Sequence, residues 1–136
     1  MLVVLGVLLT LGVASGSAAP APGTSLTISA WSTGGRTMHT YKLTCAPAAV
    51  RGDAVGRLRA VDACAALREI GARIYLPALS KHLKGCNYIQ APRKATIAGN
   101  RNGRRVRTVL QMGGCEQLLV PASLLGRVVV WPAFRR

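Results

Sequence analysis

Alternation of apolar and polar residues predicts two strands in the first part of this chain. The first is Ser25–Ser32, where apolar residues share one face and hydroxyl residues occupy the other. The apolar residues of this strand are Leu26, Ile28 and Ala30. A turn is expected at Gly34-Gly35, and the alternating segment Thr37–Cys45 predicts the second strand.

A hairpin is the clearest signal in the second part. The segments Lys94–Gly99 and Arg104–Met112 flank Asn100-Arg101-Asn102-Gly103, and an Asn-Gly pair is typical of a tight turn between two antiparallel strands. The β-branched run Val128–Trp131 predicts a closing strand.

Helical signals are shorter. After a loop rich in Ala, Gly and Arg, Asp62 is expected to be the N-cap of a helix that ends at Gly71. The apolar stripe of that helix is Cys64, Leu67 and Ile70. Glu116–Leu119 predicts a short helix before Pro121. Because no long helical crossover separates successive strands, the pattern indicates an α+β domain, an antiparallel sheet with helices on one face.

The amino-terminal segment has the pattern of a secretory signal. Residues 1–13 are apolar, and Gly16-x-Ala18 offers small residues for cleavage before Ala19. We therefore expect a signal peptide at 1–18, a disordered segment at 19–24, a domain at 25–136 and a secreted, extracellular protein. A membrane anchor is disfavoured because the run is short for a span of about 20 residues and lacks a basic flank.

Charged residues are unbalanced, with 18 Lys and Arg against 4 Asp and Glu and a net charge of +14 in 136 residues. The few carboxylates share no local motif, and the two histidines, His39 and His82, lie far apart. Ser80 is close to His82 in sequence, but no acid is placed to complete a catalytic triad. We therefore expect a protein that is not an enzyme and has no cofactor and no metal. The carboxylates are Asp53, Asp62, Glu69 and Glu116.

Four cysteines in a secreted chain indicate disulfides. None lies in a Cys-x-x-Cys pair, which argues against a zinc site. Four cysteines allow three pairings, of which the sequential one closes two moderate loops, each contributing about 3 kcal/mol in the loop-entropy description. The cysteines are Cys45, Cys64, Cys86 and Cys115.

The order and spacing of several short segments resemble the Streptomyces subtilisin inhibitor family of secreted serine-protease inhibitors, over about residues 25–136. The segments are Leu43–Pro47, Cys64–Leu67, Cys86–Pro92, Gly103–Val106 and Cys115-Glu116. The resemblance implies a five-stranded antiparallel sheet with two helices, and disulfides Cys45–Cys64 and Cys86–Cys115. It also implies a homodimer formed through the sheet.

By the same resemblance the reactive bond lies two residues after the third cysteine, at Tyr88–Ile89. The reactive loop would comprise Cys86, Asn87, Gln90, Ala91 and Pro92 around that bond. A disulfide before the bond and a proline after it would restrict the segment before binding. Tyr88 suits the apolar pocket of subtilisin-like and chymotrypsin-like proteases. The alternatives are an ordinary loop tyrosine, or attack by trypsin at the nearby Lys84 or Arg93.

Two departures from the family pattern predict a weak or temporary inhibitor. Asn87 stands where the family usually has proline, and Gly113-Gly114 stands where it tends to have Asn-Glu, whose Asn braces the loop. Both changes would leave the reactive loop less restricted.

The high positive charge supports an alternative function, a cationic secreted protein that binds anionic polymers on the same scaffold without inhibition. Alternation places Arg105 and Arg107 on one face of their strand and Arg104 and Val106 on the other. With six aromatic residues in the chain, a base-stacking platform is not expected, so we predict no specific nucleic-acid partner and no membrane partner. The tripeptide Arg51-Gly52-Asp53 is read as a chance match to an integrin motif. Arginines 101, 104, 105 and 107 cluster on the hairpin, and two more end the chain.

Overall fold

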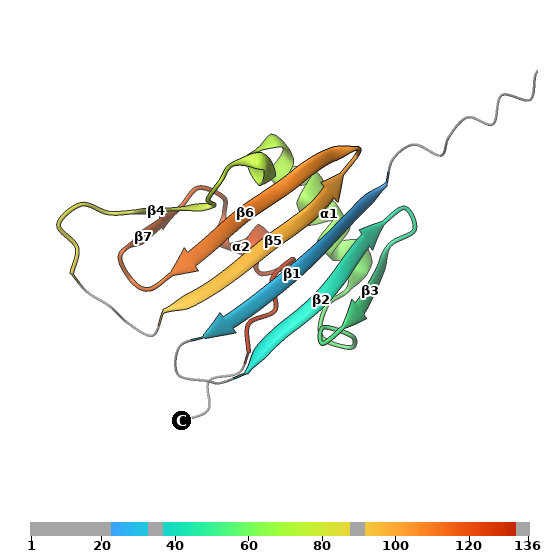
Figure 1. Cartoon of the computed structure of the whole chain (residues 1–136), viewed down its shortest axis with the longest axis horizontal. Helices are drawn as coiled ribbons and strands as arrows, with labels where there is room; N and C mark the ends of the chain where they lie inside the picture. Colours follow the sequence, from blue (N-terminus) through green and yellow to red (C-terminus); the bar gives the residue numbers. More distant parts are fainter. Residues whose placement is uncertain (1–22, 33–36, 88–91, 133–136) are drawn as a thin grey trace, which may run out of the picture.

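The computed structural model describes residues 23–32, 37–87 and 92–132. Alternating residues build a five-stranded antiparallel sheet in the order β3-β2-β1-β5-β6, with a separate two-stranded ladder of β4 and β7 (Figure 1). The elements are β1 (Thr24–Ser32), β2 (Met38–Cys45), β3 (Ala49–Gly52), α1 (Ala60–Ile70), a 3-10 turn η1 (Gly71–Tyr75), β4 (Ser80–His82), β5 (Arg93–Arg101), β6 (Arg104–Met112), β7 (Glu116–Leu118) and α2 (Ala122–Leu125).

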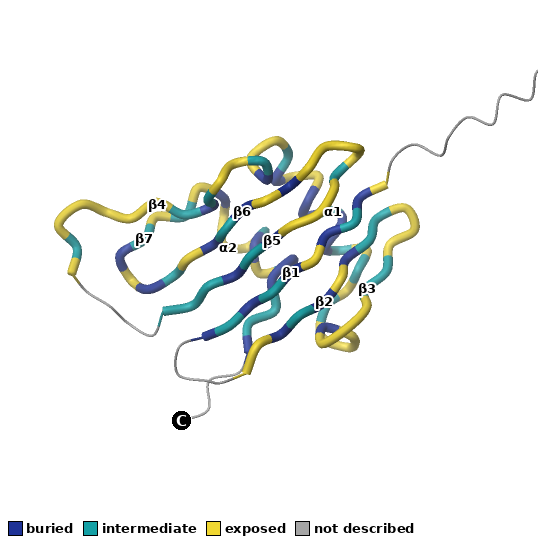
Figure 2. The backbone as a smooth tube through the Cα atoms, viewed as in Figure 1, coloured by how far each residue is buried: buried dark blue, intermediate teal, exposed yellow. Residues whose placement is uncertain are grey.

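Both helices lie on one face of the sheet, as predicted (Figure 1). In β1 the apolar residues Leu26, Ile28 and Ala30 are fully buried, whereas Thr27 between them is exposed. Buried and less buried positions alternate in the same way along the neighbouring strands (Figure 2). The core therefore lies between one sheet face and the helices, and the other sheet face is uncovered by them.

The hairpin prediction is confirmed. β5 and β6 pair from Arg93↔Met112 to Arg101↔Arg104. Asn102 and Gly103 occupy the turn with positive φ angles of 49° and 83°, which Asn and Gly tolerate best. The Gly103 amide donates to Asn100 Oδ1 at 2.7 Å, which fixes the turn.

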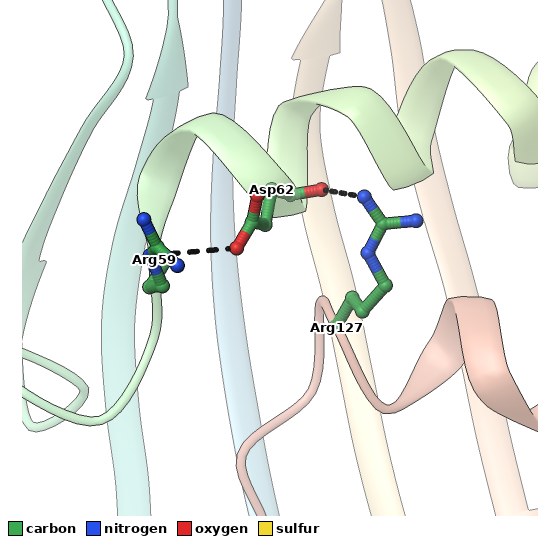
Figure 3. A network of polar contacts seen from close by, with 3 residues as sticks. All are labelled: Arg59, Asp62 and Arg127. Atoms are coloured by element: carbon green, nitrogen blue, oxygen red, sulfur yellow. Dashed lines mark hydrogen bonds and ion pairs between the residues drawn. The ribbon is translucent and has the colours of Figure 1, made fainter.

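Helix α1 begins before Asp62, so the predicted N-cap is wrong. Arg59 occupies that position in an extended conformation, and its carbonyl accepts from the Ala63 amide at 2.9 Å. Asp62 lies in the first turn, where its carboxylate is 3.5 Å from Arg59 Nε and its carbonyl accepts from Arg127 at 3.1 Å (Figure 3). The predicted end is right, because Gly71 terminates the helix with a positive φ of 63°. The stripe Cys64, Leu67 and Ile70 is buried, as expected.

Two other segments differ from the prediction because they form strands. The segment expected to be a loop after Cys45 contains β3, which pairs with β2 from Thr44↔Ala49 to Tyr41↔Gly52. The expected helix Glu116–Leu119 is instead β7, because Glu116–Leu118 finds a pairing partner in β4; the short helix α2 follows Pro121. Only four residues long, β3 shows no alternation that would reveal it.

The expected strand Val128–Trp131 is not part of the sheet, because its polar backbone groups are bonded elsewhere. The Val129 amide donates to Leu125 O at 2.8 Å. The buried Tyr41 hydroxyl donates to Val128 O and accepts from the Val130 amide at 3.0 Å. Burial raises the pKa of Tyr41 to about 12, although the hydrogen bond from Val130 acts in the opposite direction.

Both predicted disulfides are present. Cys45–Cys64 links the end of β2 to α1, so it joins the sheet to the helical layer. Cys86–Cys115 links the segment after β4 to the residue before β7. The expected turn at Gly34-Gly35 and the expected signal peptide lie outside the described residues.

Candidate functional site

The candidate site lies around the Cys86–Cys115 disulfide, here called the clamp. The β4–β7 ladder brings the two cysteines together by pairing His82 with Glu116. Beyond the last pair, the Leu83 amide donates to Cys115 O at 2.7 Å. Backbone pairing thus leads directly into the clamp, which holds the start of segment 86–92 against the rest of the fold.

Segment 86–92 is fixed at both described ends. Asn87 is exposed next to the clamp, and Pro92 is half-buried immediately before β5. The predicted reactive bond Tyr88–Ile89, together with Gln90 and Ala91, lies outside the described residues. The structure therefore defines the attachment points of the predicted reactive loop.

A glutamate beside the clamp supplies bracing that the sequence analysis did not anticipate. Glu116 Oε2 accepts from the Gly113 amide at 2.6 Å and from the Cys115 amide at 3.2 Å. Gly113 is buried between this carboxylate and Pro92, since a Cβ placed on it would lie 3.4 Å from Glu116 Oε2 and 3.6 Å from Pro92 Cβ. The two glycines were expected to leave the reactive loop less restricted, which stays a prediction; the turn that contains Gly113 is itself held by a carboxylate three residues later. The signal in the sequence was the acidic residue directly after Cys115.

Aromatic rings hold the start of β5, on the other side of segment 86–92. The guanidinium of Arg93 lies over the Trp131 ring at 5.9 Å from its centroid. The ammonium of Lys94 lies over the Trp31 ring at 5.4 Å. Such cation–π contacts contribute about 0.5–1 kcal/mol each at exposed sites, so the exit from segment 86–92 is held by side chains as well as by strand pairing.

A cavity of about 580 Å³ opens beside the clamp. It reaches from the disulfide to the ends of β1, β5 and β6, and its lining mixes apolar, basic and acidic side chains. The described residues that line it are Trp31, His82, Cys86, Asn87, Pro92, Arg93, Lys94, Gln111, Met112, Gly113, Cys115 and Glu116.

The serine and histidines considered for catalysis take part in structural contacts. Ser80 Oγ accepts from the Gln111 amide at 3.0 Å and so joins β4 to β6. His82 faces Glu116 across the ladder, and the Glu116 carboxylate accepts from backbone amides. His39 is buried, with Nε2 3.1 Å from Arg57 Nη1. Within residues 23–32, 37–87 and 92–132, no group of three His, Cys, Asp or Glu side chains could hold a metal ion.

The arginine cluster of the hairpin is divided between two faces, as the alternation predicts. Arg104 lies over the Tyr75 ring at 4.1 Å, and Arg101 donates to Gly71 O at 2.7 Å, so both contact the helical layer. Val106 is buried, whereas Arg105 and Arg107 are exposed on the uncovered face of the sheet.

Two wider observations complete the description of the chain. Among the described residues, no helix is both long enough and apolar enough to cross a membrane. Comparison of the sequence with protein-family models and with curated proteins finds no match.

Proposed function

We propose that this protein is a secreted inhibitor of serine endopeptidases, of the subtilisin-like and chymotrypsin-like classes. It binds in the manner of a substrate through segment 86–92, with Tyr88–Ile89 as the reactive bond. The proposal combines the resemblance of the cysteine framework with the attachment of this segment in the fold.

The observation that carries the proposal is the clamp. Cys86 precedes the proposed bond and is covalently linked to Cys115, which follows it in the chain. With Pro92 leading into β5, only five residues separate the two attachment points, which limits the conformations of the segment. A segment restricted before binding loses little conformational entropy in the complex, which favours affinity.

The clamp also explains how a substrate-like segment would inhibit rather than be consumed. The protease serine attacks the Tyr88 carbonyl and the Ile89 nitrogen leaves with a proton, giving an acyl-enzyme. The disulfide keeps both chain ends on one molecule, so the Ile89 amine stays close to the acyl carbon. Its return re-forms the peptide bond and releases the serine, in competition with hydrolysis by water.

Tyr88 determines the protease class in this proposal, because its ring fits an apolar primary pocket and a trypsin-like pocket requires Lys or Arg. Arg93, the basic residue that follows Pro92, is half-buried with its guanidinium over Trp131, and this supports Tyr88 over Arg93 as the specificity residue. Lys84 is exposed but precedes the clamp.

Titration of subtilisin, chymotrypsin and trypsin with the oxidised protein tests the proposal. The parent protein should reduce subtilisin or chymotrypsin activity stoichiometrically, and Tyr88→Lys should shift inhibition toward trypsin. Lys84→Gln is the matched control, since it changes a nearby exposed residue outside segment 86–92 and should leave subtilisin inhibition unchanged. If Tyr88→Lys inhibits chymotrypsin as well as the parent does and gains nothing on trypsin, the reactive bond lies elsewhere.

A further inference from the structure

The sheet face that α1 and α2 leave uncovered is strongly basic. In Figure 1 this face is toward the viewer, with the helices behind it. Of the carboxylates, two lie on α1, one lies on β7 at the clamp, and Asp53 lies just beyond β3, at the edge of this face, where it accepts from the Thr40 amide at 2.9 Å. Strand alternation places five cations on this face: Lys42, Arg51, Lys94, Arg105 and Arg107.

Strand register places four of these cations in two groups, one on each side of the face. Lys42 faces Thr27, Thr27 faces Ala98, and Ala98 faces Arg107 across four adjacent strands. Three interstrand steps of about 4.8 Å separate Lys42 from Arg107, a distance of about 14 Å. Arg51 adjoins Lys42 on β3, and Arg105 is two residues from Arg107 on β6.

The floor of this surface consists of short side chains on β1 and β5. We call the floor and its two basic sides the basic trough. The floor residues are Ser25, Thr27, Ser29, Thr96, Ala98 and Asn100.

The cations of the basic trough are available for an external partner. Lys42, Arg51, Arg105 and Arg107 are exposed, and within the described part of the chain none of them makes a side-chain hydrogen bond or ion pair. Arg104, one residue away on the opposite face, shows the contrast, because its guanidinium lies over the Tyr75 ring at 4.1 Å. Four unneutralised charges on one small surface repel one another, and an anionic partner relieves that repulsion.

We propose that the basic trough binds a linear phosphate-bearing polymer that has no bases and lies along β1 and β5. A single phosphate cannot contact both sides of a surface about 14 Å wide, whereas a polymer contacts several cations and releases several counterions. Thr27 on the floor is exposed, and its hydroxyl can donate a further hydrogen bond to a phosphate oxygen. The ring at the end of the trough, Trp31, lies under Lys94, so the surface offers charge and hydroxyls rather than a row of rings for stacking bases.

Charge also argues against a second copy of this chain as the occupant. Two such faces in contact would bring the five cations of one copy against the five of the other. The homodimer implied by the resemblance would therefore be opposed by repulsion on this face, most strongly at low ionic strength.

Binding of inorganic polyphosphate, measured by fluorescence anisotropy over a series of salt concentrations, tests the proposal. With four contacts, log K should fall with log salt with a slope of about −3, taking about −0.7 for each contact. The double variant Lys42→Gln, Arg107→Gln should bind at least tenfold more weakly, with a slope of about −1.5.

The matched control is Arg68→Gln, Lys81→Gln, which removes two exposed cations from α1 and β4. Both double variants have a net charge of +12, since each loses two of the +14. Equal weakening by the two variants would show attraction by net charge alone and would overturn the proposal. Tighter binding of single-stranded DNA than of polyphosphate of equal charge would also overturn it, because stacking would then dominate.

Sedimentation velocity without polymer tests whether a second copy of the chain occupies this face. The face would be assigned to a second copy if the parent protein is a stable dimer and polyphosphate neither binds to it nor dissociates it. Inhibition of subtilisin should be the same in the parent and in Lys42→Gln, Arg107→Gln, because neither residue belongs to segment 86–92 or to the clamp. The proposal thus stands or falls independently of protease inhibition.

Discussion

Removing the Glu116 carboxylate should loosen the turn beside the clamp. Glu116→Ala deprives the Gly113 and Cys115 amides, bonded at 2.6 Å and 3.2 Å, of their acceptor. Both residues are buried, so the two donors would not be fully rehydrated. A hydrogen bond to a charged group contributes about 1.5–3 kcal/mol. Because Glu116 itself is half-buried and water can replace part of the interaction, we expect a loss of about 2 kcal/mol in the free energy of unfolding.

Glu116→Gln is the matched control, since its amide oxygen can accept both bonds without a charge. It should cost about 1 kcal/mol, the difference between a charge-assisted and a neutral hydrogen bond. Urea unfolding of the oxidised proteins measures both values.

The functional readout is the lifetime of the intact segment. If the bracing energy restricts segment 86–92, a loss of about 2 kcal/mol corresponds to cleavage after Tyr88 that is up to about 30-fold faster. Mass spectrometry during incubation with catalytic subtilisin, together with residual protease activity, measures this rate. The link between the Glu116 hydrogen bonds and the reactive segment would be refuted if the Glu116→Ala variant loses stability as expected and is still cleaved at the parent's rate. An unchanged unfolding free energy would refute the energetic argument itself.

Three further predictions concern the clamp, residues 87 and 113 beside it, and the contact of Tyr41 with the C-terminal segment. Cys86→Ser combined with Cys115→Ser should convert segment 86–92 into a substrate cut after residue 88. Persistent inhibition, with that bond intact by mass spectrometry, would contradict the role of the disulfide. Asn87→Pro with Gly113→Asn should tighten inhibition and lengthen the life of the complex, because proline restricts the backbone and the Cβ at position 113 meets neighbours at 3.4–3.6 Å. The inhibition constant and the dissociation rate of the complex measure the two effects. Tyr41→Phe should cost about 2 kcal/mol in urea unfolding, since it removes two hydrogen bonds. The folded-state pKa of Tyr41, about 12, exceeds the ordinary 10. The parent should therefore lose about 2 kcal/mol as pH rises from 10 to 12, a loss that the Phe variant should lack; parallel pH profiles would contradict this.

Local sequence determined the long strands and their turn. Alternation of Leu26, Ile28 and Ala30 with hydroxyl residues requires a strand with one buried face, and the structure buries those three side chains completely. Asn102-Gly103 determines the hairpin because its backbone angles suit Asn and Gly. The stripe of α1 and its end at Gly71 were equally readable, since helical spacing and a terminal glycine are local features.

Tertiary structure decided the segments with weak local preference. Glu116–Leu118 forms a strand because it pairs with Ser80–His82. The local sequence before Pro121 favoured a helix and gave no information about that distant partner. Val128–Trp131 has strand-forming residues, but its backbone binds the Tyr41 hydroxyl and pairs with no described strand. The helix start moved to Ala60 because a backbone hydrogen bond to Arg59, not a side-chain cap, initiates it.

The candidate site shows the same division. Cysteine spacing and the resemblance were sufficient to predict the clamp, because a covalent link depends on a few residues that the sequence displays. The Glu116 brace required a fold that turns Gly113 back toward the carboxylate, which spacing alone does not establish. The basic trough also depended on the fold, because the cations of β2 and β6 become neighbours only when β1 and β5 pair between them. Sequence alone determined which residues carry charge, and strand order determined that they share one surface, since pairing between distant segments is fixed by burial of the whole core rather than by any local preference.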